Sequence, residues 1–209
     1  VLAFKKDREH FCGSFVYAPL PTRKHIDRYI IIDGQQRFTT LYILIKALAD
    51  SATDESDKAE LEKYLYNEDK FNRYGLDDKS KLKLKPVKTD NDQLQLLMAG
   101  KLDKMNKGKD GIIYHNYMLF RELIATFLAE DPDNSIMMIH DGMDSLICAD
   151  IKLDQDDDAQ EIFERINSTG IKLGLPDLIR NYVLMTDDDQ ERPVSYTHLR
   201  AHETVLDLV

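Results

Sequence analysis

The chain has 209 residues and a net charge of −10, with 43% hydrophobic and 32% charged residues. This composition is typical of a globular chain that can bury one good core or two small ones. The charge is uneven: the first 50 residues carry +3, whereas residues 111–154 and 155–192 carry −6 each. A broad duplex-binding face is therefore excluded, because neutralising phosphates requires clustered Lys and Arg. Any contact with nucleic acid would have to be local.

The two cysteines, Cys12 and Cys148, lie in apolar runs that predict strands, so buried and reduced thiols are expected. No CxxC or HxxH spacing indicates a metal site. No apolar run reaches the roughly 18 residues that a membrane span needs. The sequence therefore predicts a cytoplasmic chain without a membrane partner.

The first 50 residues predict a hairpin followed by a helix. Residues 10–18 predict a strand in which Gly13 allows close packing, and PLPTRKH, residues 19–25, predicts a polar turn. Residues 28–33 predict a second strand that is buried in its middle. Residues 38–49 then show the three-four spacing of apolar residues that indicates a helix.

The middle of the chain predicts mostly helices: one within 51–66, one at 90–99 ended by a glycine, one at 112–129 and one at 134–144. A short strand is expected in KFNRYGL and a buried strand at 146–153. The Lys79–Lys88 stretch alternates lysine with leucine, which indicates a strand with one lysine face. Two interpretations of that face remain: a solvated edge strand, or a ribbon that contacts phosphates.

The segment IIDGQQRFTT, Ile31 to Thr40, carries the clearest chemical signal. A strand, a glycine turn and a helix start form a geometry that binds anions, because the first amides of a helix have no internal partners. The site would consist of Asp33, Gly34, Gln35, Gln36, Arg37, Thr39 and Thr40. Arg37 would grip phosphate oxygens and Asp33 would hold Mg²⁺ through water or orient an attacking water. The structural alternative is that Asp33 caps the helix and pairs with Arg37.

A second polar segment is FERINSTGIKLGLPDLIRN, in which two predicted helices flank an Asn/Ser/Thr/Gly loop. One interpretation is an ordinary helix end at Asn167 with Gly170 in a left-handed conformation. The other places Asn167, Ser168, Thr169 and Lys172 beside a bound nucleotide or base.

Together the two segments resemble the GmrSD-type restriction endonuclease N-terminal domain family. The hallmarks are present as YIIIDGQQRFTTLYILIKAL and FERINSTGIKLGLPDLIRNYVL, and the resemblance covers roughly residues 10–187. It implies an α+β fold, with a small ParB/sulfiredoxin-like mixed sheet and a large helical portion. It also implies an NTP-binding and NTP-hydrolysing, DNA-sensing domain in a bacterial, modification-dependent phage-defence system. Asp33, Gln35, Gln36 and Arg37 would then be catalytic, and Gly34, Thr39, Thr40, Asn167, Gly170 and Lys172 would bind the nucleotide.

The same resemblance sets expectations about domains and partners. Residues 1–50 would form the sheet-and-helix part, lacking the family's first segment, and residues 51–192 the helical remainder, with the second motif at 163–180. Residues 193–209 look like a non-native tail, and the chain like a fragment. No His-Asn-His segment is recognisable, so a separate nuclease domain or subunit is the expected partner beside DNA. The alternative function is a non-catalytic DNA-binding or protein-docking module.

Overall fold

The structure, a computed structural model, describes residues 9–23, 26–67, 81–86, 88–154 and 157. The chain divides into two compact units, Val1–Ile151 and Lys152–Val209. The helices and strands reported below lie in the first unit, except for the last residue of the third strand. The predicted divisions at residues 50 and 192 stay a prediction.

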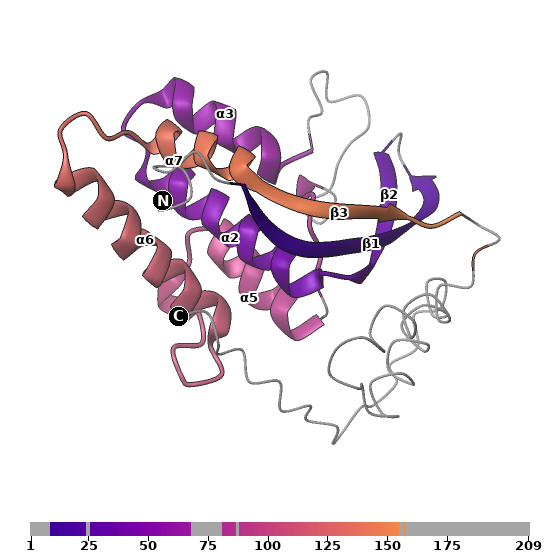
Figure 1. The fold of residues 1–209 in the computed structure, drawn as a ribbon. Helices are drawn as coiled ribbons and strands as arrows, with labels where there is room; N and C mark the ends of the chain where they lie inside the picture. Colours follow the sequence, from indigo (N-terminus) through magenta and orange to yellow (C-terminus); the bar gives the residue numbers. More distant parts are fainter. Residues whose placement is uncertain (1–8, 24–25, 68–80, 87, 155–156, 158–209) are drawn as a thin grey trace. The chain divides into compact units, whose positions relative to one another are not determined.

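A three-stranded sheet is formed by β1 (His10–Arg23), β2 (Ile26–Asp33) and β3 (Leu146–Lys152) in the order β2-β1-β3. β1 and β2 pair antiparallel, which confirms the predicted hairpin. β1 and β3 run in the same direction, so the sheet is mixed (Figure 1). With five α-helices among the described residues, the fold is α+β, as the sequence predicted. Whether it is related to ParB and sulfiredoxin stays a prediction.

The hairpin is longer than predicted, because β1 continues through the prolines that were expected to form the turn. Pro19 lies opposite Tyr29 and Leu20 opposite Arg28. The pairing register then shifts between Leu20 and Arg23. Proline removes an N–H donor but is compatible with extended backbone where the ladder is irregular, which explains why the strand does not stop at residue 18.

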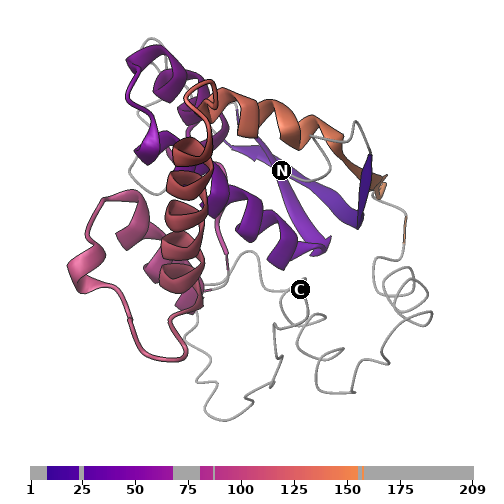
Figure 2. The same cartoon turned by 60° about the vertical axis from the view of Figure 1, so that its left-hand side comes forward.

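The helices are α2 (Gln35–Ser51), α3 (Glu55–Leu65), α5 (Lys88–Met98), α6 (Ile112–Glu130) and α7 (Ile136–Gly142). Two 3-10 turns follow α5 and α7, at Leu102–Lys104 and Met143–Ser145. α2 packs against α3, α6 and α7. It lies between the sheet and α6 in both views (Figures 1 and 2). The helix that follows the glycine turn is therefore the central element of this unit.

The hydrophobic core forms where α2 meets α3, α5 and α6. Its most completely buried large side chains on these helices are Ile43, Leu48, Leu61, Leu65, Leu94 and Leu97. α6 contributes Ile113, Tyr117 and Ile124 at the predicted helical spacing. By contrast Leu123, an apolar residue of the same helix, is 54% exposed. Burying one such side chain stabilises the fold by about 1.5–3 kcal/mol.

Three expectations about burial are wrong. β3 was expected to be buried but has mostly exposed side chains. Cys148 is correspondingly exposed and Cys12 is half-buried. A short apolar run does not reveal whether one or both faces of its strand are covered, and β3 lies at an edge of this sheet.

The predicted lysine-faced strand is not regular over its described part, residues 81–86. Only Leu82 forms a bridge, to Tyr66. The alternation itself is real, since Leu82 is buried while Lys81, Lys83 and Lys85 are exposed. The burial of Leu82 between exposed lysines therefore produces the alternation, and it does not require a sheet. The strand expected in KFNRYGL lies outside the described residues.

A polar junction ties the end of α2 to α6. Tyr117 Oη donates to Asp50 Oδ2 at 2.8 Å, and Arg121 Nη1 donates to the Asp50 carbonyl at 2.9 Å. Lys46 pairs with the same carboxylate at 2.6 Å. Burial, followed by the Asp50 hydrogen bond, raises the pKa of Tyr117 to about 12. The protonated phenol is thus the form that the folded chain favours.

Truncating a core side chain should lower the free energy of unfolding far more than truncating a side chain on the exposed face of α6. Leu61→Ala is expected to lower the free energy of unfolding by about 2–5 kcal/mol, because it leaves a cavity under α2. Leu123→Ala, at an exposed position, should change it by less than about 0.5 kcal/mol. Urea unfolding of both variants measures this, and equal losses would contradict the packing described here.

The Tyr117 junction should make stability fall at high pH. Because the folded-state pKa lies above the ordinary value of 10.0, its contribution is complete below pH 10 and is lost as pH rises towards 12. The stability advantage of the wild type over Tyr117→Phe should therefore shrink by up to about 2–3 kcal/mol between pH 9 and pH 12. A difference that does not change with pH would show that Tyr117 is not perturbed in the folded chain.

Candidate functional site

The turn between β2 and α2 depends on Gly34. It adopts a left-handed backbone, with φ of 89° and ψ of 11°, and is buried. A Cβ at this position would lie 2.5 Å from Cδ1 of Phe15. Both the backbone and the space therefore require glycine. The chain leaves the sheet at Asp33 and enters the helix at Gln35 with this single residue between them.

The helix begins three residues earlier than the sequence predicted. The first backbone bond of α2 runs from the Phe38 amide to the Gly34 carbonyl at 2.9 Å. Gln35, Gln36 and Arg37 thus form the first turn, whereas the apolar pattern begins only at Phe38. Their amides precede the helical hydrogen-bond ladder and point out of the helix end.

No side chain caps this helix end. Gly34 occupies the N-cap without a side-chain hydrogen bond, and the first turn contains no acidic residue. By comparison, α3 has both a capping Asp54 and acidic residues in its first turn. The positive end of the α2 dipole is consequently not neutralised by its own first turn. A bound anion would supply the negative charge and the hydrogen-bond acceptors that the first turn of α2 lacks.

Arg37 lies across the inside of the hairpin. Its Nη2 donates to the Ser14 carbonyl at 2.6 Å and to Asp33 Oδ2 at 3.0 Å. The guanidinium lies 5.6 Å from the centre of the Phe15 ring and against Gly13, where an added Cβ would lie 3.2 Å from Nη1. The close packing predicted at Gly13 is therefore observed, and Arg37 occupies the space.

Part of the Arg37 side chain remains exposed despite these contacts. Its side chain is 41% exposed, and Nε is buried without a hydrogen-bond partner. An unsatisfied buried donor costs about 1–3 kcal/mol, and because Nε has almost no accessible surface, a ligand could accept from it only if the side chain moved. Nη2 is engaged with the protein, and the exposed part of the side chain remains accessible to solvent.

Asp33 forms an ion pair with Arg37 and does not cap the helix. Its Oδ2 accepts from Arg37 and, at 3.4 Å, from the Ser14 hydroxyl. Of the two parts of the structural alternative, the Asp33–Arg37 pair is observed, whereas the helix cap by Asp33 is not. Both partners are partly exposed, so this pair contributes no more than about 1 kcal/mol.

The glutamines and threonines extend from the same helix turn. Gln35 and Gln36 are exposed, and Gln35 Nε2 donates back to the Ile31 carbonyl at 2.7 Å. Gln36 also has an interaction partner. Thr39 donates its hydroxyl proton to the Gln35 carbonyl at 2.9 Å, while Thr40 is exposed. The structure thus brings together every predicted residue of the first motif at one helix end.

Two participants were not singled out by the sequence reasoning. Ser14 supplies the carbonyl that holds Arg37, and Phe15 supplies the ring that fixes Gly34 and faces the guanidinium. A small residue followed by an aromatic in a strand is common, so the sequence carried no specific signal for either role. The second motif, with Asn167, Gly170 and Lys172, lies outside the described residues.

Other parts of the described chain offer no competing metal centre. No group of three or more His, Cys, Asp or Glu side chains is placed to hold a metal within the described ranges. An open groove of about 620 Å³ lies along α6, lined among others by Leu102, His115 and Leu119. None of the residues of the DGQQR turn lines this groove. None of the described helices combines the length and apolar character needed to cross a membrane.

Comparison with known families decides the relationship. Residues 3–184 match the family described as the GmrSD restriction endonuclease, N-terminal domain. The chain belongs to this family. The match includes the DGQQR turn and the second motif. No curated protein matches the chain. As a GmrSD N-terminal domain, the chain is a module of a restriction system.

Gly34 and Gly100, two of the three described glycines with positive φ, provide a matched test of the turn. Gly34→Ala and Gly100→Ala should each cost about 1–2 kcal/mol for the left-handed backbone. Gly34→Ala should cost a further 1–3 kcal/mol or so, because its Cβ meets Phe15, whereas nothing lies within 4 Å of a Cβ at Gly100. Urea unfolding compares them, and equal losses would show that Phe15 does not hold the turn.

Proposed function

We propose that this chain is the nucleotide-binding, NTP-hydrolysing and DNA-sensing domain of a modification-dependent restriction system. The observation that supports the proposal most is the uncapped start of α2 beside Arg37. Amides with no side-chain cap, an unneutralised helix dipole and a partly exposed arginine meet at one place. Phosphate is the ligand chemistry that uses all three.

The chain's own groups suggest how phosphates would be held. The amides of Gln35, Gln36 and Arg37 would donate to phosphate oxygens along the helix axis. Arg37 would donate from the edge of its guanidinium opposite the Ser14 and Asp33 contacts, and so stabilise charge on the transferred group. Because the Ser14 carbonyl and Asp33 already fix that guanidinium, little reorganisation would be needed.

Asp33 fits a supporting role in the same scheme. One of its oxygens, Oδ2, is engaged with Arg37 and Ser14, and the carboxylate is one-quarter exposed. It would hold Mg²⁺ through water, or orient the attacking water, with its other oxygen. Magnesium would supply charge neutralisation at the phosphates when bound. Gln35, Gln36, Thr39 and Thr40 would bind the nucleotide and the water around it.

The alternative is a non-catalytic module in which the same turn accepts a DNA backbone phosphate or docks a partner. The chemistry of the donors is identical, so only turnover separates the two. The lysine-rich stretch that motivated this alternative is less available than the sequence suggested. Lys83 donates to the Lys63 carbonyl, and Lys81 and Lys85 have interactions of their own.

Arg37 should be essential for turnover. In the full-length protein with DNA present, Arg37→Lys is expected to reduce NTP hydrolysis about 10²–10³-fold, because a point charge replaces a fixed donor fork. Arg121→Lys is the matched control, since Arg121 also donates to a backbone carbonyl, at Asp50, and lies on α6. Steady-state phosphate release measures both.

Two results would contradict the proposal. Unchanged turnover in Arg37→Lys would remove the residue from the reaction. An equal fall in Arg121→Lys would mean that the loss came from a weakened fold. Nucleotide binding without hydrolysis in the wild type would instead favour the non-catalytic alternative.

A further inference from the structure

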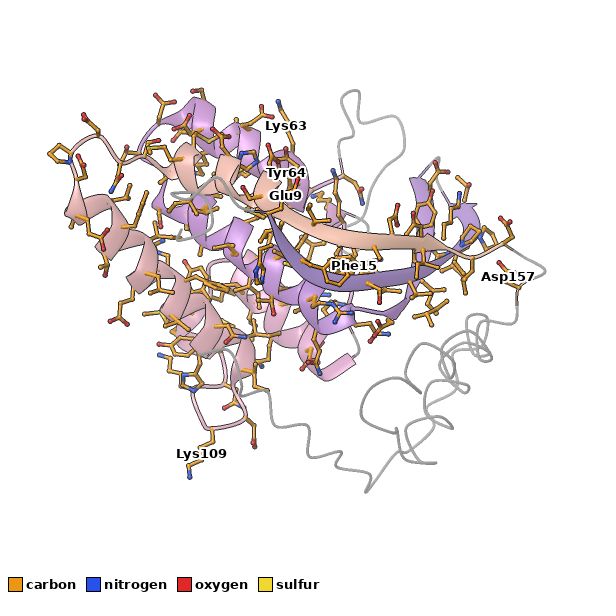
Figure 3. The ribbon with its side chains drawn as sticks, in the orientation of Figure 1. Glu9, Phe15, Lys63, Tyr64, Lys109 and Asp157 are labelled. Carbon is orange, nitrogen blue, oxygen red and sulfur yellow. The ribbon has the colours of Figure 1, made fainter. Side chains whose placement is uncertain are left out.

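The connection between α5 and α6, residues 101–111, is rich in exposed lysines. The sequence KLDKMNKGKDG contains four lysines and two aspartates, a net charge of +2 in a chain of net charge −10. All four are exposed: Lys101, Lys104, Lys107 and Lys109. We call residues 101–111 the lysine loop. Figure 3 shows Lys109 projecting away from the loop into solvent.

These lysines are not committed to partners within the described part of the protein. None of the four forms an ion pair or a side-chain hydrogen bond with another described residue, whereas Lys46 pairs with Asp50 and Lys63 with Glu60. Lys107 makes one soft contact, with its ammonium 5.4 Å from the centre of the Tyr114 ring. The loop therefore presents ammonium groups that are available to a ligand, and Tyr114 holds one of them in place.

The backbone that carries the lysines is built into the fold. Met105 is buried under the loop, and the Asn106 amide donates to Gln93 Oε1 at 2.8 Å. Farther along, the Gly108 amide donates to Asn106 Oδ1 at 2.9 Å, and His115 Nε2 donates to the Gly108 carbonyl at 2.9 Å. A ligand bound by this loop would not first have to order its backbone.

We propose that the lysine loop binds the phosphate backbone of duplex DNA. Protein–protein interfaces are depleted in lysine and rely on aromatic and apolar anchors. No large apolar side chain is exposed between residues 101 and 111. Unpaired lysines on a short fixed loop suit a row of phosphates, which positions a duplex without reading its bases. DNA is also the polymer on which a restriction endonuclease acts.

This surface is separate from the DGQQR turn. It lies on the α5–α6 connection, whereas Arg37 and Asp33 hydrogen-bond to each other and to Ser14 on β1. The lysine loop would bring DNA to the module, while the turn would bind nucleotide. It also differs from the Lys79–Lys88 stretch, whose three described odd-numbered lysines already have partners.

Salt-dependent DNA affinity tests the proposal in the full-length protein. The probe is a fluorescently labelled duplex, titrated over a series of KCl concentrations. Replacing all four loop lysines by glutamine should make the slope of log Kd against log salt shallower by about 0.9 for each phosphate that the loop no longer neutralises, up to about 3.6. Replacing them by arginine should retain the wild-type slope.

The matched control replaces Lys81, Lys83 and Lys85 by glutamine and should leave the slope unchanged. The glutamine variant of the loop should also unfold as the wild type does and retain DNA-independent NTP turnover. An unchanged slope in the loop variant, an equal change per lysine in the control, or no DNA binding by the wild type at the lowest salt would overturn the proposal. Loop-dependent DNA binding without NTP turnover would refute the proposed function alone.

Discussion

The position of Arg37 is the constraint on which the rest of the site depends. Its guanidinium connects the end of β2, the backbone of β1 and the first turn of α2 through Asp33 and the Ser14 carbonyl. The Coulombic part of this arrangement is small, because both side chains of the ion pair are partly exposed. Its effect is geometric. The helix that leaves the sheet can point in only one direction when Arg37 is fixed against the strand.

Two glycines make that position possible. Gly13 leaves room for the guanidinium on β1, and Gly34 lets the chain turn in one residue while Phe15 packs beneath it. Both have positive φ angles that other residues rarely adopt. The same features that hold the sheet and helix together therefore expose the first amides of α2. A capping side chain would have satisfied those amides and removed the reason to bind an anion.

The sequence predicted the elements better than their boundaries or exposure. Apolar patterns and helix signals in the sequence located the hairpin, the five described helices and the third strand. The apolar pattern placed the start of α2 at Phe38, because Gln35, Gln36 and Arg37 are polar and do not contribute to that pattern. It also mistook the alternation of Lys81, Leu82 and Lys83 for a strand, when only one bridge is formed.

The residues of the candidate site could be predicted from the sequence, but the contacts between them could not. Residue types and order indicated an anion-binding turn, and the structure places those residues at the start of α2. The partners of Arg37 on β1 could not be read from the chain, because Ser14 acts through its carbonyl and Phe15 through its position. The lysine loop had no sequence signal of its own, since it is distinguished by lysines without partners among the described residues, which only the fold reveals.

The claim that the α2 N-terminus receives phosphate can be tested most directly by amide chemical shifts. Isotope-labelled protein would be titrated with a nucleoside triphosphate and Mg²⁺, and the resonances of Gln35, Gln36 and Arg37 followed. The account predicts saturable shifts at these three amides, larger than those at the start of α3, where Asp54 already caps the helix. Shifts elsewhere with these amides unmoved would contradict it.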